Sequence, residues 1–150
     1  MKINKYRTKI SIFLTCGLLI FFSPNLIAQK HFLSEISYKN NLSKQKKLTS
    51  QKLPQIRKDD NVTETTELIL EYFFSTNTTK KAKEITAKLQ SFEYKAEFKK
   101  NPKNPNLYIV TGWIIKMKMS DKLILDWTKV MCDLGYEFDC SFDGWETGLK

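Results

Sequence analysis

The hydrophobic and polar positions from residue 63 onward follow two different periods. Stretches that alternate every second residue, or that are rich in β-branched and aromatic residues, predict strands, and apolar residues repeated every three to four positions predict helices. We therefore expect strands over residues 67–75, 94–99, 107–117 and 136–147, with helices between residues 77 and 92 and between 120 and 134. The order strand, helix, strand, strand, helix, strand predicts an α+β fold.

This order is the split βαβ pattern. It predicts a ferredoxin-like βαββαβ plait, in which two helices pack on one face of a four-stranded antiparallel sheet. Gly135 follows the apolar stripe of the second helix, so we expect it to end that helix in a left-handed conformation. Asp143 and Gly144 are expected to form a bulge or turn that lets Trp145 cap the edge of the core. The last strand is expected to point Tyr136, Phe138, Cys140 and Phe142 inward, and Glu137, Asp139 and Ser141 outward.

One face of the predicted sheet has no helix to cover it. Because the strand over residues 107–117 is apolar on both faces, some of its hydrophobic side chains must point away from the helices. Exposed apolar patches of this kind mark partner surfaces, so the sequence predicts binding of a protein partner or of a second copy of the chain there. The residues expected at the centre of this open face are Ile69, Phe73, Tyr108, Val110 and Ile114.

The first 28 residues have the three-part order of a secretory signal peptide. A basic segment over residues 2–9 precedes an apolar run over residues 10–22, and a polar break follows before Ala28. The sequence therefore predicts export to the periplasm or the outside of the cell, with cleavage after Ala28. The alternative is a retained membrane anchor, since residues 10–28 are about long enough to span a bilayer.

Residues 29–62 are rich in Ser, Asn, Gln and Lys, and their apolar residues show no sustained period. We therefore expect a basic, polar, disordered linker between the signal and a single domain over residues 63–150. The whole net charge of +9 lies in residues 1–62, because residues 63–150 carry equal numbers of acidic and basic side chains. Charge thus does not favour nucleic-acid binding by the domain, and membrane contact is expected only through an uncleaved N-terminus.

The chain shows no residue combination that predicts catalysis, a cofactor or a metal site. His31 is the one histidine and lies in the predicted linker. Glu137 and Asp139 are expected on the outer sheet face, without a His, Cys or Ser base as a partner there. We therefore expect the domain not to be an enzyme. Cys132 and Cys140 are expected to be free thiols, because the predicted helix and strand separate them by about 12 Å along the axis, beyond the reach of a disulfide.

The predicted domain closes on the string Leu134-Gly-Tyr-Glu-Phe-Asp-Cys-Ser-Phe-Asp-Gly-Trp145. With the order of the elements, this string resembles the RraB family, small regulators that inhibit ribonuclease E by binding that enzyme; Asp143, Gly144 and Trp145 are the motif that carries the resemblance. The resemblance implies a non-catalytic protein-binding regulator, and the export signal implies a partner other than the cytoplasmic ribonuclease E. If residues 1–28 are not a signal, it implies a cytoplasmic ribonuclease regulator, and an extracytoplasmic small-ligand-binding or enzyme domain is a further alternative.

Overall fold

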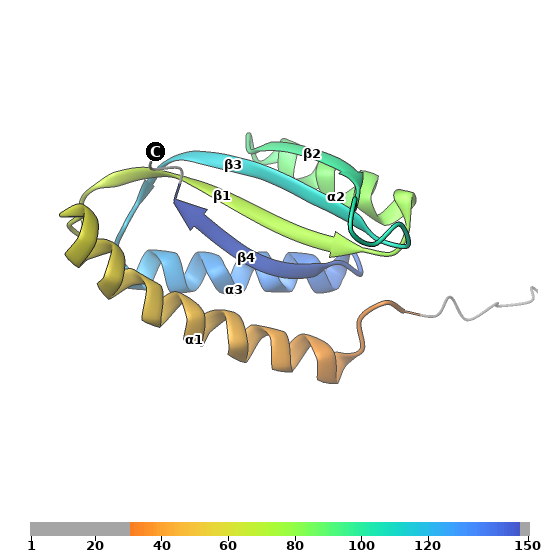
Figure 1. Cartoon of the computed structure of the whole chain (residues 1–150), viewed down its shortest axis with the longest axis horizontal. Helices are drawn as coiled ribbons and strands as arrows, with labels where there is room; N and C mark the ends of the chain where they lie inside the picture. The colour runs from red at the N-terminus through yellow and green to blue at the C-terminus, as the bar shows by residue number, and fades with distance from the viewer. Residues whose placement is uncertain (1–30, 148–150) are drawn as a thin grey trace, which may run out of the picture.

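The computed structural model describes residues 31–147, which form an α+β fold on one four-stranded sheet (Figure 1). Its elements are α1 (Glu35–Asp60), β1 (Glu67–Thr76), α2 (Thr79–Ser91), β2 (Lys95–Lys100), β3 (Tyr108–Lys118), α3 (Asp121–Glu137) and β4 (Ser141–Thr147). The strands are antiparallel in the order β2-β3-β1-β4. From β1 to β4, the order of elements confirms the ferredoxin-like plait.

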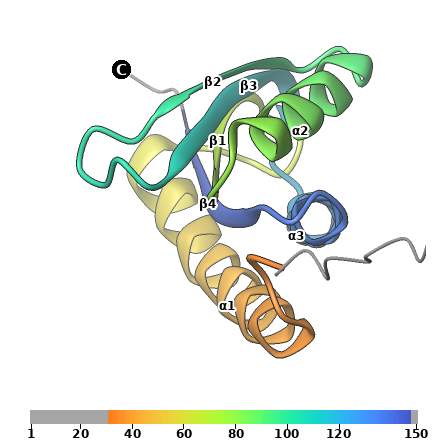
Figure 2. The ribbon, with the colours of Figure 1, turned by 90° about the vertical axis from the view of Figure 1, so that its right-hand side faces the viewer.

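Helices α2 and α3 lie on the same face of the sheet, here called the inner face (Figure 2). Their apolar stripes meet the inward-pointing residues of the strands, and this contact removes apolar surface from water, which is the main favourable term in folding. The residues that are fully buried between these two layers include Leu70, Tyr72, Phe74, Ile85, Leu89 and Ile124. The opposite side of the sheet is called the outer face.

Residues 35–60 form the 26-residue helix α1, where we had predicted a disordered linker. The helix begins after Ser34, whose side chain accepts a hydrogen bond from the Ser37 backbone N–H. The linker prediction was wrong because it followed apolar residues only, whereas half of the buried stripe is polar. The buried residues of α1 are Gln45, Thr49, Leu53 and Ile56. Neither α1 nor any other helix within residues 31–147 is long and apolar enough to cross a membrane.

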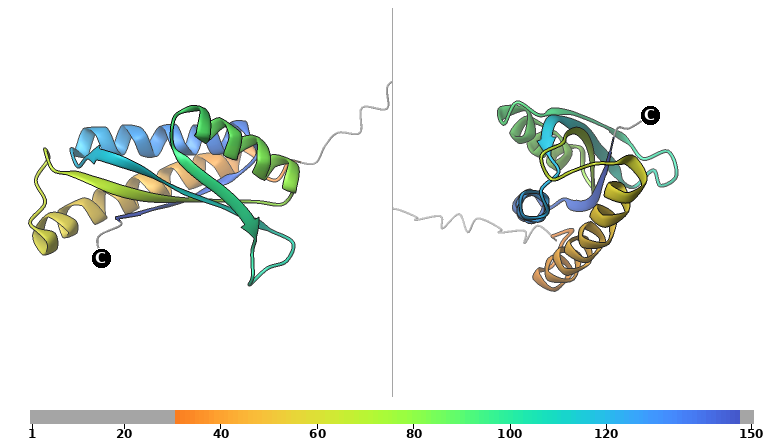
Figure 3. Two further views of the ribbon diagram at one scale, coloured as in Figure 1. Left: turned by 90° about the horizontal axis from the view of Figure 1, so that it is seen from above. Right: turned by 90° about the vertical axis from the view of Figure 1, so that its left-hand side faces the viewer.

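Helix α1 runs beside α3 and along the edge of β4 (Figures 1 and 3). Asn41 Nδ2 and Gln45 Nε2 donate to the carbonyl of Phe142 at 2.9 and 3.2 Å, and Lys52 Nζ donates to the carbonyl of Trp145. Carbonyls on the edge of a sheet would otherwise be open to pairing with another strand. Side chains of α1 therefore occupy hydrogen-bonding positions that an added strand would need.

The side chains of β3 that we expected on the outer face point to the inner face instead. Val110 pairs with the buried Phe74 and is itself fully buried on the inner face. Tyr108 and Ile114 lie in the same inward row and pack, partly buried, against the core. Because this strand is apolar on both faces, its alternation does not define which residues point inward, and a shift of one residue reverses every side chain. The residues of β3 on the outer face include Ile109, Thr111 and Trp113, and the exposed Ile115 and Lys118 follow near the end of the strand.

Gly112 provides a second reason for the wrong assignment of β3. It lies in the inward row, where the hydroxyl of Tyr72 donates to the carbonyl of Lys95 at 2.6 Å. A Cβ atom on Gly112 would lie 2.5 Å from this hydroxyl and 1.8 Å from the carbonyl oxygen. The inward row therefore includes a residue without a side chain, and Tyr72 fills the space.

The connection from α3 to β4 also differs from the prediction. Helix α3 continues past Gly135. A Cβ atom added at this glycine would lie only 2.5 Å from the carbonyl oxygen of Cys140, so no side chain fits there. The left-handed residue is instead Asp139, with φ 54°, and this residue is buried rather than pointing outward. Tyr136 stays on the helix, exposed, and stacks on Tyr38 with 4.6 Å between the ring centroids.

The predicted bulge at Asp143 and Gly144 is confirmed. The register of β4 against β1 shifts at this point and leaves Asp143 without a partner in the ladder. Gly144 has a φ of 122°, which favours glycine because a side chain would be strained there. The bulge turns Trp145 toward the core, where it is 2% exposed.

Candidate functional site

Trp145, the last residue of the sequence motif, joins β4 to α1. Its indole Nε1 donates to Thr49 Oγ1 at 3.0 Å, and Thr49 also shares a hydrogen bond of 3.1 Å with Thr128 on α3. Lys52 Nζ lies 4.5 Å from the Trp145 ring centroid. Burial lowers the pKa of Lys52, although the nearby Glu146 carboxylate acts in the opposite direction. The indole N–H and the carbonyl of Trp145 are thus both used within the fold, which makes this residue a structural connection.

A groove of about 400 Å³ lies beside Trp145, between α1 and the outer face. Helix α1 contributes three neutral amides, Leu48 and the partly buried Lys52 to its wall. The strands contribute Phe73 and the bulge, with the two carboxylates of Asp143 and Glu146. Protein interfaces combine apolar and polar groups in this way, so the groove has the composition of a surface that binds a polypeptide.

The outer face of the sheet carries large apolar side chains that are open to solvent. Ile69, Trp113 and Ile115 are 46%, 43% and 61% exposed. Of the predicted patch, Ile69 and Phe73 lie on this side, whereas Tyr108, Val110 and Ile114 belong to the inner face. Lysine at position 110 or 114 would therefore disrupt the core. Trp113 and Ile115 were missed because the sequence was read in the other of the two possible alternations.

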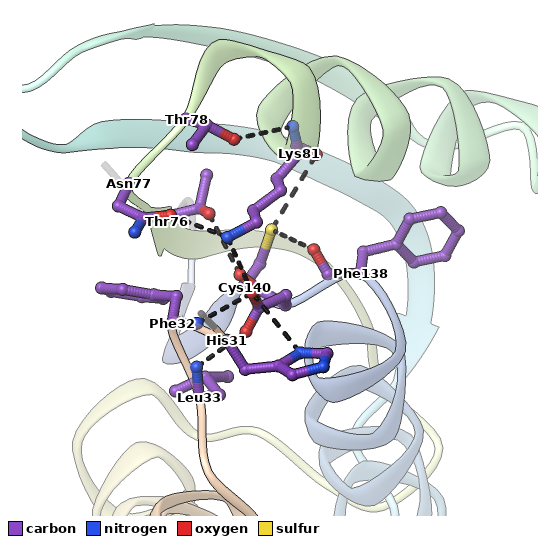
Figure 4. Close-up of polar contacts among 10 residues, drawn as sticks. His31, Phe32, Leu33, Thr76, Asn77, Thr78, Lys81, Phe138 and Cys140 are labelled. Carbon is purple, nitrogen blue, oxygen red and sulfur yellow. Dashed lines mark hydrogen bonds and ion pairs between the residues drawn. The ribbon is translucent and has the colours of Figure 1, made fainter. Parts of the chain in front are cut away.

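Asp139 connects the start of the described chain to β1 and to α2. Figure 4 shows its partners Phe32, Leu33 and Lys81. Its carboxylate accepts hydrogen bonds from the backbone N–H groups of Phe32 and Leu33 at 2.8 and 2.7 Å, and Lys81 Nζ lies 2.7 Å away. His31 Nδ1 lies 3.8 Å from the same carboxylate. Burial pushes the pKa of Asp139 upward, but the Lys81 and backbone hydrogen bonds outweigh it and hold the pKa below its ordinary value. These contacts are structural.

Within residues 31–147, no cluster of three or more His, Cys, Asp or Glu residues could hold a metal ion. Cys132 and Cys140 are buried free thiols, and burial raises the pKa of each to about 12. Such thiols are protonated at neutral pH and therefore poor nucleophiles.

Residues 46–147 match the family model RraB, described as regulator of ribonuclease activity B. The match extends from the middle of α1 to the end of β4 and so includes the outer face, the Asp143-Gly144-Trp145 motif and the lining of the groove apart from Gln45. No curated protein matches the chain.

Proposed function

Because this chain belongs to the RraB family of regulators of ribonuclease activity, we propose that it regulates by binding a protein and catalyses no reaction itself. The observation that supports this best is the exposed apolar centre of the outer face, formed by Ile69, Trp113 and Ile115. Apolar side chains gathered on one face favour a partner surface. The groove beside α1 is continuous with this face through Phe73 and extends the proposed surface.

The second part of the proposal is export. The basic, apolar and polar segments of residues 1–28, which lie outside the described residues, support a cleaved signal peptide. An exported regulator would meet an extracytoplasmic protein rather than ribonuclease E. The alternative is a cytoplasmic regulator of a ribonuclease, which applies if residues 1–28 are not a signal.

Cell fractionation with N-terminal sequencing tests export. We expect a mature chain that begins at Gln29 in the periplasm or the culture medium. A full-length chain in the membrane fraction would instead favour an anchor over residues 10–28. A full-length cytosolic chain would overturn export, and purified protein that slows RNA cleavage by ribonuclease E would then establish the alternative.

Site-specific photo-crosslinking tests the binding surface. A photoreactive benzoylphenylalanine would replace Trp113 on the outer face or, as a matched control, Val130 on α3, which is 54% exposed. On irradiation of cells that produce the protein, we expect a covalent protein adduct from position 113 and none from position 130. The further substitution Ile115→Lys should remove the adduct, because it would place a charge in an apolar contact. Adducts from position 130 alone would assign binding to the helical layer.

A further inference from the structure

The charges on the outer face are divided between its two halves. Strands β2 and β3 form a basic half, where Glu97 is the exception, and strands β1 and β4 form an acidic half. The exposed residues that define the basic half are Lys95, Lys99 and Lys118, and those that define the acidic half are Glu67, Glu71 and Glu146. Trp113 of β3 and Phe73 of β1 lie near the line where the two halves meet.

One row of residues crosses the whole sheet and shows this division clearly. Lys95 pairs with Trp113, Trp113 with Glu71, and Glu71 with Glu146. Lys95 and Glu146 stand at opposite ends of the row, on the two outermost strands. Three inter-strand spacings of about 4.8 Å separate them by about 14 Å, which is too far for an ion pair within one chain.

We propose that the partner of the outer face is a second copy of this chain, stacked face to face about a two-fold axis parallel to the strands, between β1 and β3. This rotation places the basic half of each copy over the acidic half of the other. Lys95 of one copy then lies opposite Glu146 of its partner, and the symmetry repeats the pair. The apolar side chains along the midline, with Trp113 among them, are buried between the two sheets.

The charge division favours a second copy over an unrelated partner, because the face is complementary to itself. A two-fold interface uses the same patch on both subunits, so the rotation must bring opposite charges together. Here it brings Lys95 to Glu146 and Lys118 to Glu67, whereas Glu71 lies over Trp113 of the partner subunit. Stacked sheets pack about 10 Å apart, close enough for side chains of both faces to meet. Lys52, a basic residue of α1 beside the acidic half, is already bound to the Trp145 carbonyl. The inference rests on the proposed function, since it names the protein that the outer face binds.

Charge exchange between Lys95 and Glu146 tests this arrangement by sedimentation velocity at low salt. We expect the purified wild-type protein to be a dimer at micromolar concentration. Lys95→Glu and Glu146→Lys should each weaken association at least about tenfold, because each places two like-charge pairs across the interface. The double variant Lys95→Glu/Glu146→Lys should regain the dimer, since its charges are complementary again. An equimolar mixture of the two single variants should likewise form a heterodimer.

Two controls distinguish the contact between Lys95 and Glu146 from the effect of changing the net charge of the protein. Lys83→Glu on α2, an exposed residue of the opposite layer, should leave the dimer unchanged. Trp127 and Trp145 are 7% and 2% exposed, so acrylamide quenching should report mainly Trp113 and should decrease as the dimer forms. A monomer at 100 µM, unchanged single variants, or no recovery in the double variant would each overturn the inference. If photo-crosslinks from position 113 then contain another protein, the proposed function stands and only the self-association is wrong.

Discussion

Asp139 holds two distant parts of the chain at one buried carboxylate. It binds the backbone of Phe32 and Leu33 and the ammonium group of Lys81, which is itself 8% exposed. Removing one member of a buried ion pair leaves the other charge without its counter-ion. Asp139→Asn should therefore lower the free energy of unfolding by about 3 kcal/mol in urea denaturation at pH 7. Asp126→Asn, at an exposed pair with Lys122, should change it by less than about 0.5 kcal/mol.

The same carboxylate predicts a dependence of stability on acid. Its pKa in the folded protein lies below the ordinary value of 3.8. The contribution of the ionised Asp139 carboxylate to the free energy of unfolding is therefore complete above its pKa in the unfolded chain. This contribution is lost as the pH falls through its pKa in the folded protein. The difference between the urea midpoints of the wild-type protein and Asp139→Asn should begin to shrink as the pH falls below about 3.8. A difference that stays constant to pH 2 would show that ionisation of Asp139 does not contribute.

Gly144 makes a second prediction at the scale of the residue. Its φ of 122° is strained for any side chain, and a Cβ atom would lie 3.2 Å from Gln45 Oε1. Gly144→Ala should cost about 1–3 kcal/mol of stability by urea denaturation. The matched change Ser141→Ala in the same strand, where φ is not positive, should cost less. Equal effects would show that the bulge tolerates a side chain.

At the scale of the element, α1 is an integral part of the fold. Leu53 is 1% exposed in the core, whereas Leu48 on the same helix is 43% exposed. Leu53→Ala should therefore destabilise the protein by about 3 kcal/mol, because it leaves a cavity. Leu48→Ala should change stability by less than about 0.5 kcal/mol. Circular dichroism during urea denaturation would measure both, and equal small effects would mean that α1 does not pack on the domain.

Helix α1 and strand β3 show where prediction from sequence stops. Strand β1 and helices α2 and α3 were predictable because their apolar residues keep a regular period. The buried polar residues Gln45 and Thr49 hide the period of α1, since their burial depends on partners about 80 to 100 residues away. Which side chains of β3 point to the inner face depends on the register in which this strand pairs with β1. For this reason only part of the outer face was predicted: Ile69 and Phe73 lie on it as expected, but the position of Trp113 depends on the register of β3.

At the scale of the whole molecule, modification of the cysteines would report both the folded state and the removal of the predicted signal peptide. Cys132 and Cys140 are buried, and the pKa of each is raised to about 12, so a thiol reagent at pH 8 should leave both unmodified in the native protein. The third cysteine, Cys16, belongs to the predicted signal. Mass spectrometry of the mature protein, alkylated in denaturant without reductant, should therefore show two adducts. No adduct would indicate a disulfide, and three would indicate that the signal is retained.

The contact between α1 and β4 joins the first and last elements of the described chain. Asn41 bonds to Phe142, Thr49 to Trp145 and Lys52 to the Trp145 carbonyl, across more than 90 residues. A chain emerges from the ribosome, or crosses a membrane as an extended polypeptide, N-terminus first. Helix α1 therefore lacks one of its two packing partners until β4 has been made or has crossed. A chain that ends eight residues before Thr147 would keep α3 but lack β4, and α1 would lose its hydrogen bonds to Phe142 and Trp145 and become more accessible to proteases and chaperones.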